Sequence, residues 1–203
     1  MTRRFLLHCV APVLVLGWAS GAQAGIMFST GNHPQPGEEN VLFGAKESGT
    51  SITGHTNITN TAVQFSSTTD TLVQKAQGQA DIFASDGLVN NITIAEPFLT
   101  FGDLIMNPMN GSGTATVTAV TNDGTFTFTY ALGNGQNFLT IVATNGEVIE
   151  SVTVDAPDGF KDFKQPRISP ATAIPEPTSI ALLGLGVAGL GGYRILRRRA
   201  GSS

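Results

Sequence analysis

The sequence predicts an all-β fold, an antiparallel β-sandwich of jelly-roll type, between an N-terminal signal peptide and a single C-terminal transmembrane helix. From residue 40 to 169, runs of Thr, Val, Ile and Phe are separated every eight to twelve residues by Gly, Asn or Asp, which is typical of sandwiches and barrels. This body has no apolar stripe of helical period longer than two turns, so we expect helices there to be short or absent. Uncharged apolar runs lie near both ends of the chain.

The N-terminal segment, residues 1–24, has the layout of a secretory signal peptide. Two arginines precede an apolar run over residues 5–18, and Ala22 and Ala24 provide a small-x-small cleavage site. We therefore expect the mature chain to begin at Gly25, after export by the Sec machinery and cleavage by signal peptidase. The alternative is an uncleaved N-terminal anchor.

The mature body is expected to divide into an irregular lead over residues 25–39, which contains Pro34 and Pro36, and one β domain over residues 40–169. Gly, Asn and Asp mark the turns between its strands. We expect strands over residues 41–45, 51–56, 61–66, 76–84, 88–95, 98–107, 114–119, 125–130, 137–143 and 147–154.

The clearest alternation lies between residues 113 and 155. Threonines alternate first with Ala115 and Val117 and then, after a turn at Asp123, with Phe126 and Phe128. A period of two with one apolar and one hydroxyl face predicts a half-buried pair of antiparallel strands. We expect the four strands of this section to form a meander.

Charge and cysteine content exclude several classes of function. Between residues 25 and 173, five Lys or Arg stand against fourteen Asp or Glu, a formal charge of −9. Binding to the phosphate backbone needs the opposite sign, so nucleic acid is excluded as a partner. The one cysteine, Cys9, lies in the signal peptide, so the mature chain has neither a disulfide nor a thiol nucleophile.

The mature sequence contains no recognisable catalytic motif, and we expect it not to be an enzyme. His33 and His55 have no carboxylate or second histidine at metal-ligand spacing, and we expect both at the surface. Two carboxylate pairs, Glu38 with Glu39 and Glu147 with Glu150, are the nearest to the acid pair of a glycosidase. We expect them on solvated faces, although a secreted hydrolase remains an alternative.

A structural calcium ion is a further alternative, because loop carboxylates and carbonyls of exported acidic domains often bind one. The candidate ligands are Asp81 with Asp86, and Asn122 with Asp123. Neither set has the spacing of an EF-hand, and the Asp-Gly and Asn-Asp-Gly runs suffice as turns. We therefore expect no bound metal or cofactor.

The C-terminal residues consist of a proline-rich spacer over residues 170–179, an apolar segment over residues 180–196 and a basic tail over residues 197–203. As a helix, the apolar segment spans about 25 Å, which is enough to cross a thin hydrocarbon core. One face of this helix carries small side chains that allow a partner helix to approach, namely Gly184, Ala188 and Gly192. A basic stop that stays in the cytoplasm consists of Arg194, Arg197, Arg198 and Arg199.

Pro175, Glu176 and Pro177, followed by this apolar segment and by the arginines, resemble the PEP-CTERM sorting signal of Gram-negative bacteria that make exopolysaccharide. The resemblance implies that exosortase, a membrane-embedded transpeptidase-like enzyme, cuts the chain near Pro-Glu-Pro. Residues 159–169 also resemble the strand that closes the domain before this signal in many such proteins, the alternative being a generic edge strand. An ordinary tail anchor behind a proline-rich linker is the alternative for the signal itself.

The resemblance implies an exported protein that is held in the inner membrane during processing and then placed on the cell surface or in the extracellular matrix. We expect a structural or interaction component of an exopolysaccharide or biofilm matrix. The runner-up is a glycan-binding module. Glycan platforms usually stack sugars on Trp or Tyr, whereas residues 25–173 contain no Trp and one Tyr, Tyr130, so only the threonine faces would offer hydrogen bonds.

Overall fold

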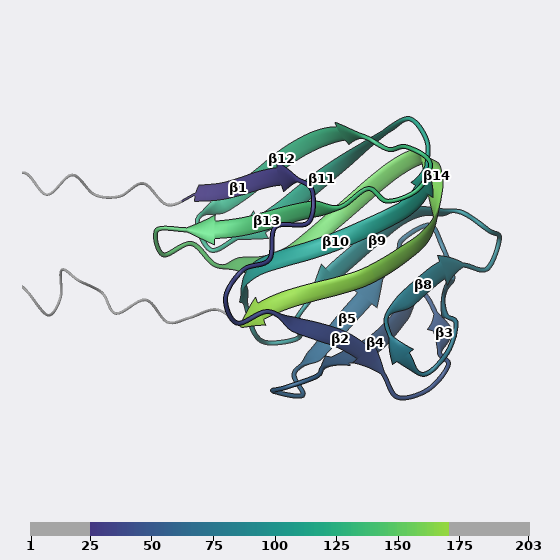
Figure 1. The fold of residues 1–203 in the computed structure, drawn as a ribbon, viewed down its shortest axis with the longest axis horizontal. Coiled ribbons are helices and arrows are strands. Elements are labelled where there is room, and N and C mark those ends of the chain that lie inside the picture. The colour runs from purple at the N-terminus through teal and green to yellow at the C-terminus, as the bar shows by residue number, and fades with distance from the viewer. Residues whose placement is uncertain (1–24, 171–203) are drawn as a thin grey trace, which may run out of the picture.

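The computed structural model describes residues 25–170, and this part of the chain consists of β-strands joined by turns and loops (Figure 1). The predicted all-β class is confirmed. Within the same residues, no helix has both the length and the apolar character needed to cross a membrane. The strands are β1 (Gly25–Thr30), β2 (Glu39–Phe43), β3 (Ser48–Gly49), β4 (Ser51–Thr56), β5 (Ala62–Ser66), β6 (Leu72–Gln74), β7 (Gly78–Gln79), β8 (Asp81–Ala84), β9 (Val89–Ala95), β10 (Phe101–Gly111), β11 (Thr114–Thr121), β12 (Gly124–Ala131), β13 (Leu139–Thr144) and β14 (Ile149–Pro170).

The long strand β14 organises the fold. Its first part lies between β9 and β11, with Thr153 opposite Thr93 on one side and Thr118 on the other. Its second part follows β10 on one edge and contacts β8 and β2 on the other. Residues 159–169, for which a generic edge strand was the alternative, therefore form the centre of the sheet (Figure 1).

Two irregularities in β14 allow this one strand to pair with five other strands. Gly159 has φ of 72°, and the pairing of β14 with β9 shifts between Asp155 and Phe160. Gln165 has φ of 55° and precedes Pro166, which has no N–H to donate, and the register against β10 shifts at the same place. Bulges of this kind bend a strand and increase its twist, so β14 turns from one group of partners to the next.

The strands form one hydrogen-bonded network that closes on itself. From β14 the pairing runs through β9, β5, β4 and β2, and β2 returns to β14 with Glu39 opposite Ile168. The result is a barrel-like closed sheet. The predicted arrangement of two separate sheets of jelly-roll type is therefore not confirmed.

The other half of the network is built from β10, β13 and β1 on one side of β14 and from β11 and β12 on the other. The outermost strands, β1 and β12, approach each other through side chains, since the rings of Phe28 and Phe128 are stacked with centroids 5.3 Å apart. Figure 1 shows both strands on the same side of the molecule.

Two predictions about this region were wrong. The expected meander is absent from residues 113–155, because β12 pairs with β11 alone while β13 pairs with β10 and β1. Gly25–Thr30, which we expected to begin an irregular lead, form β1 on the free edge of β13. Alternation predicts that a segment is a strand, but it does not choose the partner, and the prolines of the lead come only after β1 has ended.

Most strand boundaries differ from the expected ones by a few residues, and β3 and β6 lie where no strand was expected. The two largest differences concern β10 and the segment over residues 76–84. β10 begins at Phe101 and not at residue 98, because a tight turn at Pro97 and Phe98 precedes it. The strand expected over residues 76–84 is divided into β7 and β8.

The core contains a row of phenylalanine side chains from strands that are distant in sequence. Phe43 and Phe65 have ring centroids 5.8 Å apart, Phe65 and Phe163 6.0 Å, and Phe163 and Phe160 6.4 Å. All four rings are at least 98% buried. Phe160 and Phe163 of β14 therefore fill the core, as the sequence predicted. They pack β14 against the side of the closed sheet that contains β2 and β5.

Candidate functional site

The predicted sorting signal begins beyond the described fold. β14 ends at Pro170, so Pro175, Glu176 and Pro177 lie outside the described residues. The other predicted parts of the C-terminal signal also lie outside them, namely Gly184, Ala188, Gly192, Arg194, Arg197, Arg198 and Arg199. The same holds for Ala22 and Ala24, which precede the first described residue.

Both ends of the described chain lie at one end of the molecule, which we call the terminal end (Figure 1). Gly25 of β1 is opposite Thr144, the last residue of β13, and Pro170 of β14 is opposite Phe101, the first residue of β10. The loops that join β4 to β5 and β9 to β10 lie at this end too, because Ala95 at the end of β9 is opposite the beginning of β14. The chain therefore leaves its fold toward the signal from this end.

Glu39 at the terminal end closes the β4–β5 loop. One oxygen of its carboxylate accepts hydrogen bonds from the backbone N–H of Ile58 at 3.3 Å and from the N–H and hydroxyl of Thr59, each at 2.9 Å. Burial raises the pKa of Glu39, but these bonds and the Thr56 hydroxyl outweigh burial and leave the pKa below its ordinary value. Glu39 is thus an ionised group that satisfies loop amides.

Glu96 directly follows β9, and its pKa is shifted in the opposite direction from that of Glu39. Burial, and then the charge of Glu39, raise the pKa of Glu96 to about 7. Two carboxyls whose pKa values are moved apart form the pattern of a general acid and base. Both, however, are buried, with 3% of Glu39 and 5% of Glu96 exposed, so a substrate has no access to the pair in this conformation.

A third buried carboxyl, Asp103, lies where β14 ends. Burial raises the pKa of Asp103 to about 6, hydrogen bonding to Ser169 acts against this shift, and Glu38 adds to it. Arg167 lowers the same pKa and forms an ion pair with Glu38 at 3.3 Å. Asp103 Oδ1 is buried and has no hydrogen-bond partner among the described residues.

The expected solvated carboxylate pairs are mostly buried. Glu38 accepts a hydrogen bond from the N–H of Gln35 at 2.8 Å, and Glu147 accepts one from the N–H of Asp123 at 3.3 Å. Only 3% of Glu147 is exposed, whereas Glu150 is exposed as expected. The prediction was wrong for three of the four residues, because carboxylates at strand ends here serve as acceptors for the amides of neighbouring loops.

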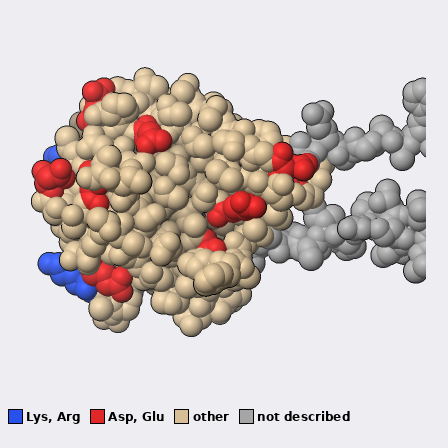
Figure 2. Space-filling model, turned by 180° about the vertical axis from the view of Figure 1, so that it is seen from behind, with Lys and Arg blue, Asp and Glu red and all other residues tan. Residues whose placement is uncertain are grey.

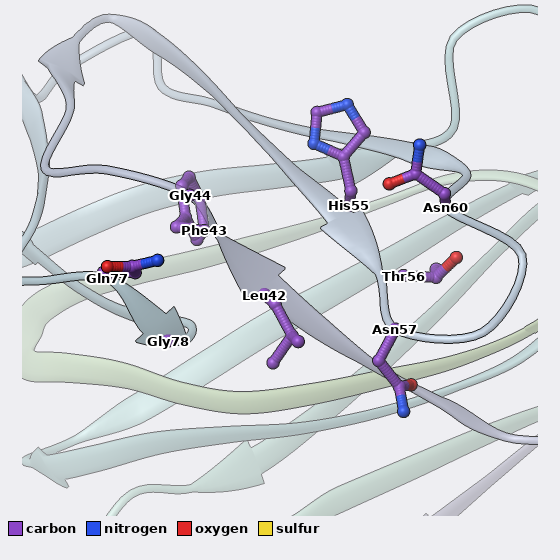
Figure 3. Close-up of a pocket in the computed structure, with 9 residues that line it drawn as sticks. All are labelled: Leu42, Phe43, Gly44, His55, Thr56, Asn57, Asn60, Gln77 and Gly78. Carbon is purple, nitrogen blue, oxygen red and sulfur yellow. The ribbon is translucent and has the colours of Figure 1, made fainter.

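A hollow of about 400 Å³ lies beside His55 (Figure 3). Leu42 of β2, His55 of β4, the β4–β5 loop and Gln77 line it. His55 and His33 are both exposed, as expected. The lining offers amides, one hydroxyl, one imidazole and two apolar side chains, but no carboxylate, so the hollow has hydrogen-bonding groups without a charged acid–base partner.

The candidate calcium ligands are not brought together. Asp81 forms ion pairs with Lys75 at 3.2 Å and with Lys164 at 3.3 Å, while Asp86 is exposed in the β8–β9 turn. Asp123 is exposed in the β11–β12 turn. Over residues 25–170, no three His, Cys, Asp or Glu side chains are grouped so that they could hold a metal ion.

Figure 2 shows one face of the molecule on which acidic side chains are spread, while the few Lys and Arg side chains in view lie away from the terminal end. This distribution agrees with the charge of −9 for residues 25–173.

The sequence alone did not identify Glu96 and Asp103. Both are isolated acidic residues at the ends of apolar strands, Ala95 preceding the first and Leu104 following the second. The sequence signal that could have identified them is an acidic residue directly next to an apolar strand, which indicates a buried carboxyl. It did not show that the two groups would lie at the same end of a closed sheet.

The fold and its exit point define an all-β domain that continues from its terminal end into a C-terminal segment. Residues 173–199 of that segment match the family model described as the PEP-CTERM protein-sorting motif. Searches of curated proteins and of solved structures found no match. The chain thus carries a PEP-CTERM sorting motif, as predicted, and this motif supports export and processing by exosortase at the membrane.

Proposed function

We propose that this protein is a non-catalytic component of the cell surface or exopolysaccharide matrix, delivered there when exosortase cuts near Pro175, Glu176 and Pro177. The position of the motif carries the proposal. The matched residues begin at 173, and the last strand of the fold ends at Pro170. Removal of the segment after the cut would leave every strand of the described domain intact.

The chemistry of the motif suits a processing site. Each proline fixes its own φ, and Pro177 also favours an extended conformation for Glu176. An extended, preformed segment binds in a protease-like site at low entropic cost. A membrane-spanning segment over residues 180–196 would hold the cleavage site close to the membrane, and the arginines after it would stop translocation.

Substitution within the motif tests this proposal in the native host. We expect Glu176→Ala to be exported and inserted normally but to accumulate at full length in the membrane fraction, because the recognised side chain is lost. Thr172→Ala, which lies just before the matched residues, is the matched control and should be processed like the unaltered protein. Normal processing of Glu176→Ala and of Pro177→Ala would count against recognition of the motif.

A second function, binding of a neutral glycan, is favoured by one row of hydroxyl groups. The row crosses six neighbouring strands, and each member is directly opposite the next. All of its side chains are at least partly exposed, and none is charged. The row consists of Thr127, Thr118, Thr153, Thr93, Ser66 and Ser51.

With strands about 4.8 Å apart, this row is about 24 Å long. It offers hydrogen-bond donors and acceptors to a chain of sugar hydroxyls, although without the aromatic stacking that gives most glycan sites their affinity. An acidic body disfavours anionic polysaccharides, which makes a neutral one the better fit.

Removal of two hydroxyls without loss of side-chain volume tests the glycan proposal. We expect the Thr118→Val, Thr153→Val double variant to weaken binding to neutral polysaccharide roughly tenfold, as for two lost hydrogen bonds. Thr71→Val, outside the row, is the control. If neutral polysaccharide binds both variants equally, or does not bind the unaltered protein, this second function fails.

A further inference from the structure

The loop between β9 and β10 displays an aromatic side chain in a strained conformation. The N–H of Leu99 donates to the carbonyl of Glu96 at 3.1 Å, Pro97 is the second residue of this turn, and Phe98, the third, has φ of 69°. This is the pattern of a type II turn, whose third position favours Gly or Asn. Bulky residues at positive φ are genuine outliers.

Phe98 gains no packing that would offset this strain, since its relative exposure is 103%. A glycine would form the same turn without strain, and a buried aromatic would at least contribute core area. Backbone strain that is retained together with full exposure of an apolar ring indicates a role outside the folding of the domain.

Two further apolar side chains are exposed in this loop and in the neighbouring β4–β5 loop. Leu99 follows Phe98 in the same loop and is 57% exposed, and Ile58 in the β4–β5 loop is 73% exposed. The two loops are neighbours, because β5 pairs with β9. In addition, Glu39 accepts a hydrogen bond from the N–H of Ile58 and lies close enough to Glu96 for its charge to raise the pKa of Glu96. We call Ile58, Phe98 and Leu99 the apolar tip.

The apolar tip contains three of the six large apolar side chains that are exposed in the described part of the chain. It lies at the terminal end, where β14 reaches Pro170. Only residues 171–179 separate Pro170 from the apolar segment that begins at residue 180. Fully extended, nine residues reach about 30 Å, so an anchored chain keeps Pro170, and with it the terminal end, close to the bilayer.

We propose that, before the C-terminal segment is removed, the apolar tip inserts into the interface of the bilayer that anchors the chain. The proposal rests on the membrane anchoring in the proposed function. Side chains such as Phe, Leu and Ile partition into the boundary between headgroups and acyl chains. Three loop residues make this contact reversible, so the domain leaves the membrane once its anchor is cut.

Charge specifies the kind of bilayer. The acidic side chains nearest to the apolar tip, Glu39 and Glu96, are buried, so no charged side chain is exposed in the two loops that carry the tip. Asp123 and Glu150 are exposed at the same end of the molecule. Together with the acidic body, they repel anionic headgroups, and the fitting partner is a zwitterionic surface.

A single tryptophan reports this contact in the full chain. Trp18 is the one tryptophan of the sequence, and Trp18→Phe removes its signal whether or not the signal peptide is cleaved. On that background, Phe98→Trp places a fluorophore at the apolar tip. Leu88→Trp is the matched control, because Leu88 is 42% exposed and precedes β9 at the opposite end of the molecule.

Each variant is reconstituted without exosortase in phosphatidylcholine vesicles whose acyl chains carry bromine, a contact quencher. We expect quenching of Phe98→Trp by roughly twofold or more relative to unbrominated vesicles, since an interfacial side chain reaches the acyl chains. Leu88→Trp should be unaffected. A Phe98→Gly variant should still co-float with the vesicles, because its anchor is unchanged, and should show a higher melting temperature, because glycine relieves the turn.

Equal emission of Phe98→Trp with and without bromine would overturn the proposal. A blue-shifted emission that bromine does not quench would overturn it as well, since a protein surface would then cover the ring. Failure of the chain to co-float with vesicles at all would contradict the proposed function instead, because the anchor itself would be missing.

Discussion

At the scale of the residue, Glu96 is a carboxyl group whose pKa the fold raises to near neutral pH. Burial and the neighbouring Glu39 raise its pKa from 4.5 to about 7. A raised pKa means that the folded state binds more protons than the unfolded state between these two values. The contribution of Glu96 to stability is therefore full below about pH 4.5 and is lost as the pH rises through 7.

Replacing Glu96 by its neutral isostere should remove this pH dependence. We expect Glu96→Gln to raise the free energy of unfolding by about 1 to 3 kcal/mol at pH 8 and to change it little at pH 4.5. Urea titrations at both pH values measure the difference. Glu150→Gln, an exposed carboxyl at the same end, should change stability by less than about 0.5 kcal/mol at either pH. The same gain for Glu96→Gln at both pH values would show that packing and not ionisation is responsible.

The turn at Phe98 shows what residue patterns leave open. Pro97 predicts a turn, but nothing in the sequence distinguishes a phenylalanine that begins a strand from one that occupies the glycine position of a turn. We expected a strand from residue 98, and the structure places Phe98 outside β10 at positive φ. The local propensity of Phe98 favours a strand. The short connection between β9 and β10 instead requires a tight turn at this residue.

At the scale of the element, the β11–β12 hairpin agrees with its sequence. Thr118 is opposite Thr127 and Val117 is opposite Phe128, so hydroxyl and apolar faces match across the pair as the alternation predicted. Val117 is fully buried, whereas Phe128 is half-buried and stacks on Phe28 of β1. The hairpin is thus fixed to the rest of the fold chiefly through its apolar face.

The two faces should respond differently to truncation. We expect Phe128→Ala to destabilise the protein by about 2 to 4 kcal/mol, because the ring loses its contacts with Phe28 and the core. Thr127→Ala, on the exposed face of the same strand, should cost less than about 1 kcal/mol. Denaturant midpoints of the two variants provide the comparison, and equal shifts would contradict the assignment of faces.

Strand positions were more predictable than strand partners. The β4 strand, Ser51–Thr56, lies where its composition and turns placed it, since periodicity is a local property. The partners of β13 and the central place of β14 depend on side chains from the whole chain. The bulges at Gly159 and Gln165 bend β14 around the closed sheet. Gly159 and Pro166 are residues that mark interruptions of a strand, but they do not show which neighbouring strands change there.

The buried carboxyls were missed for the same reason. Glu39 binds loop amides that follow it by about twenty residues in sequence. Asp103 reaches the end of β14, which lies far along the chain. Only closure of the sheet brings such groups together, whereas the C-terminal motif is contiguous and could be predicted in full.

At the scale of the whole molecule, the features that concern the membrane lie at one end of the domain. Both ends of the described chain lie at the terminal end (Figure 1). The loops that carry the apolar tip lie there as well. The sorting motif begins three residues after the last strand. In the proposed function, this end faces the membrane until the chain is cut, and the hydroxyl row crosses the sheet away from the two termini.

The mass of the C-terminus of the mature protein, taken from the surface of its native host, tests the central claim most directly. If exosortase cuts near Pro-Glu-Pro, the mature surface-exposed molecules should contain β14 and Pro170 but should lack the segment that begins at about residue 178 and ends at Ser203. Tandem mass spectrometry of the C-terminal peptide reads this out without any substitution. An intact Ser203 on most surface-exposed molecules would show that the C-terminal segment is an anchor and not a signal that is removed.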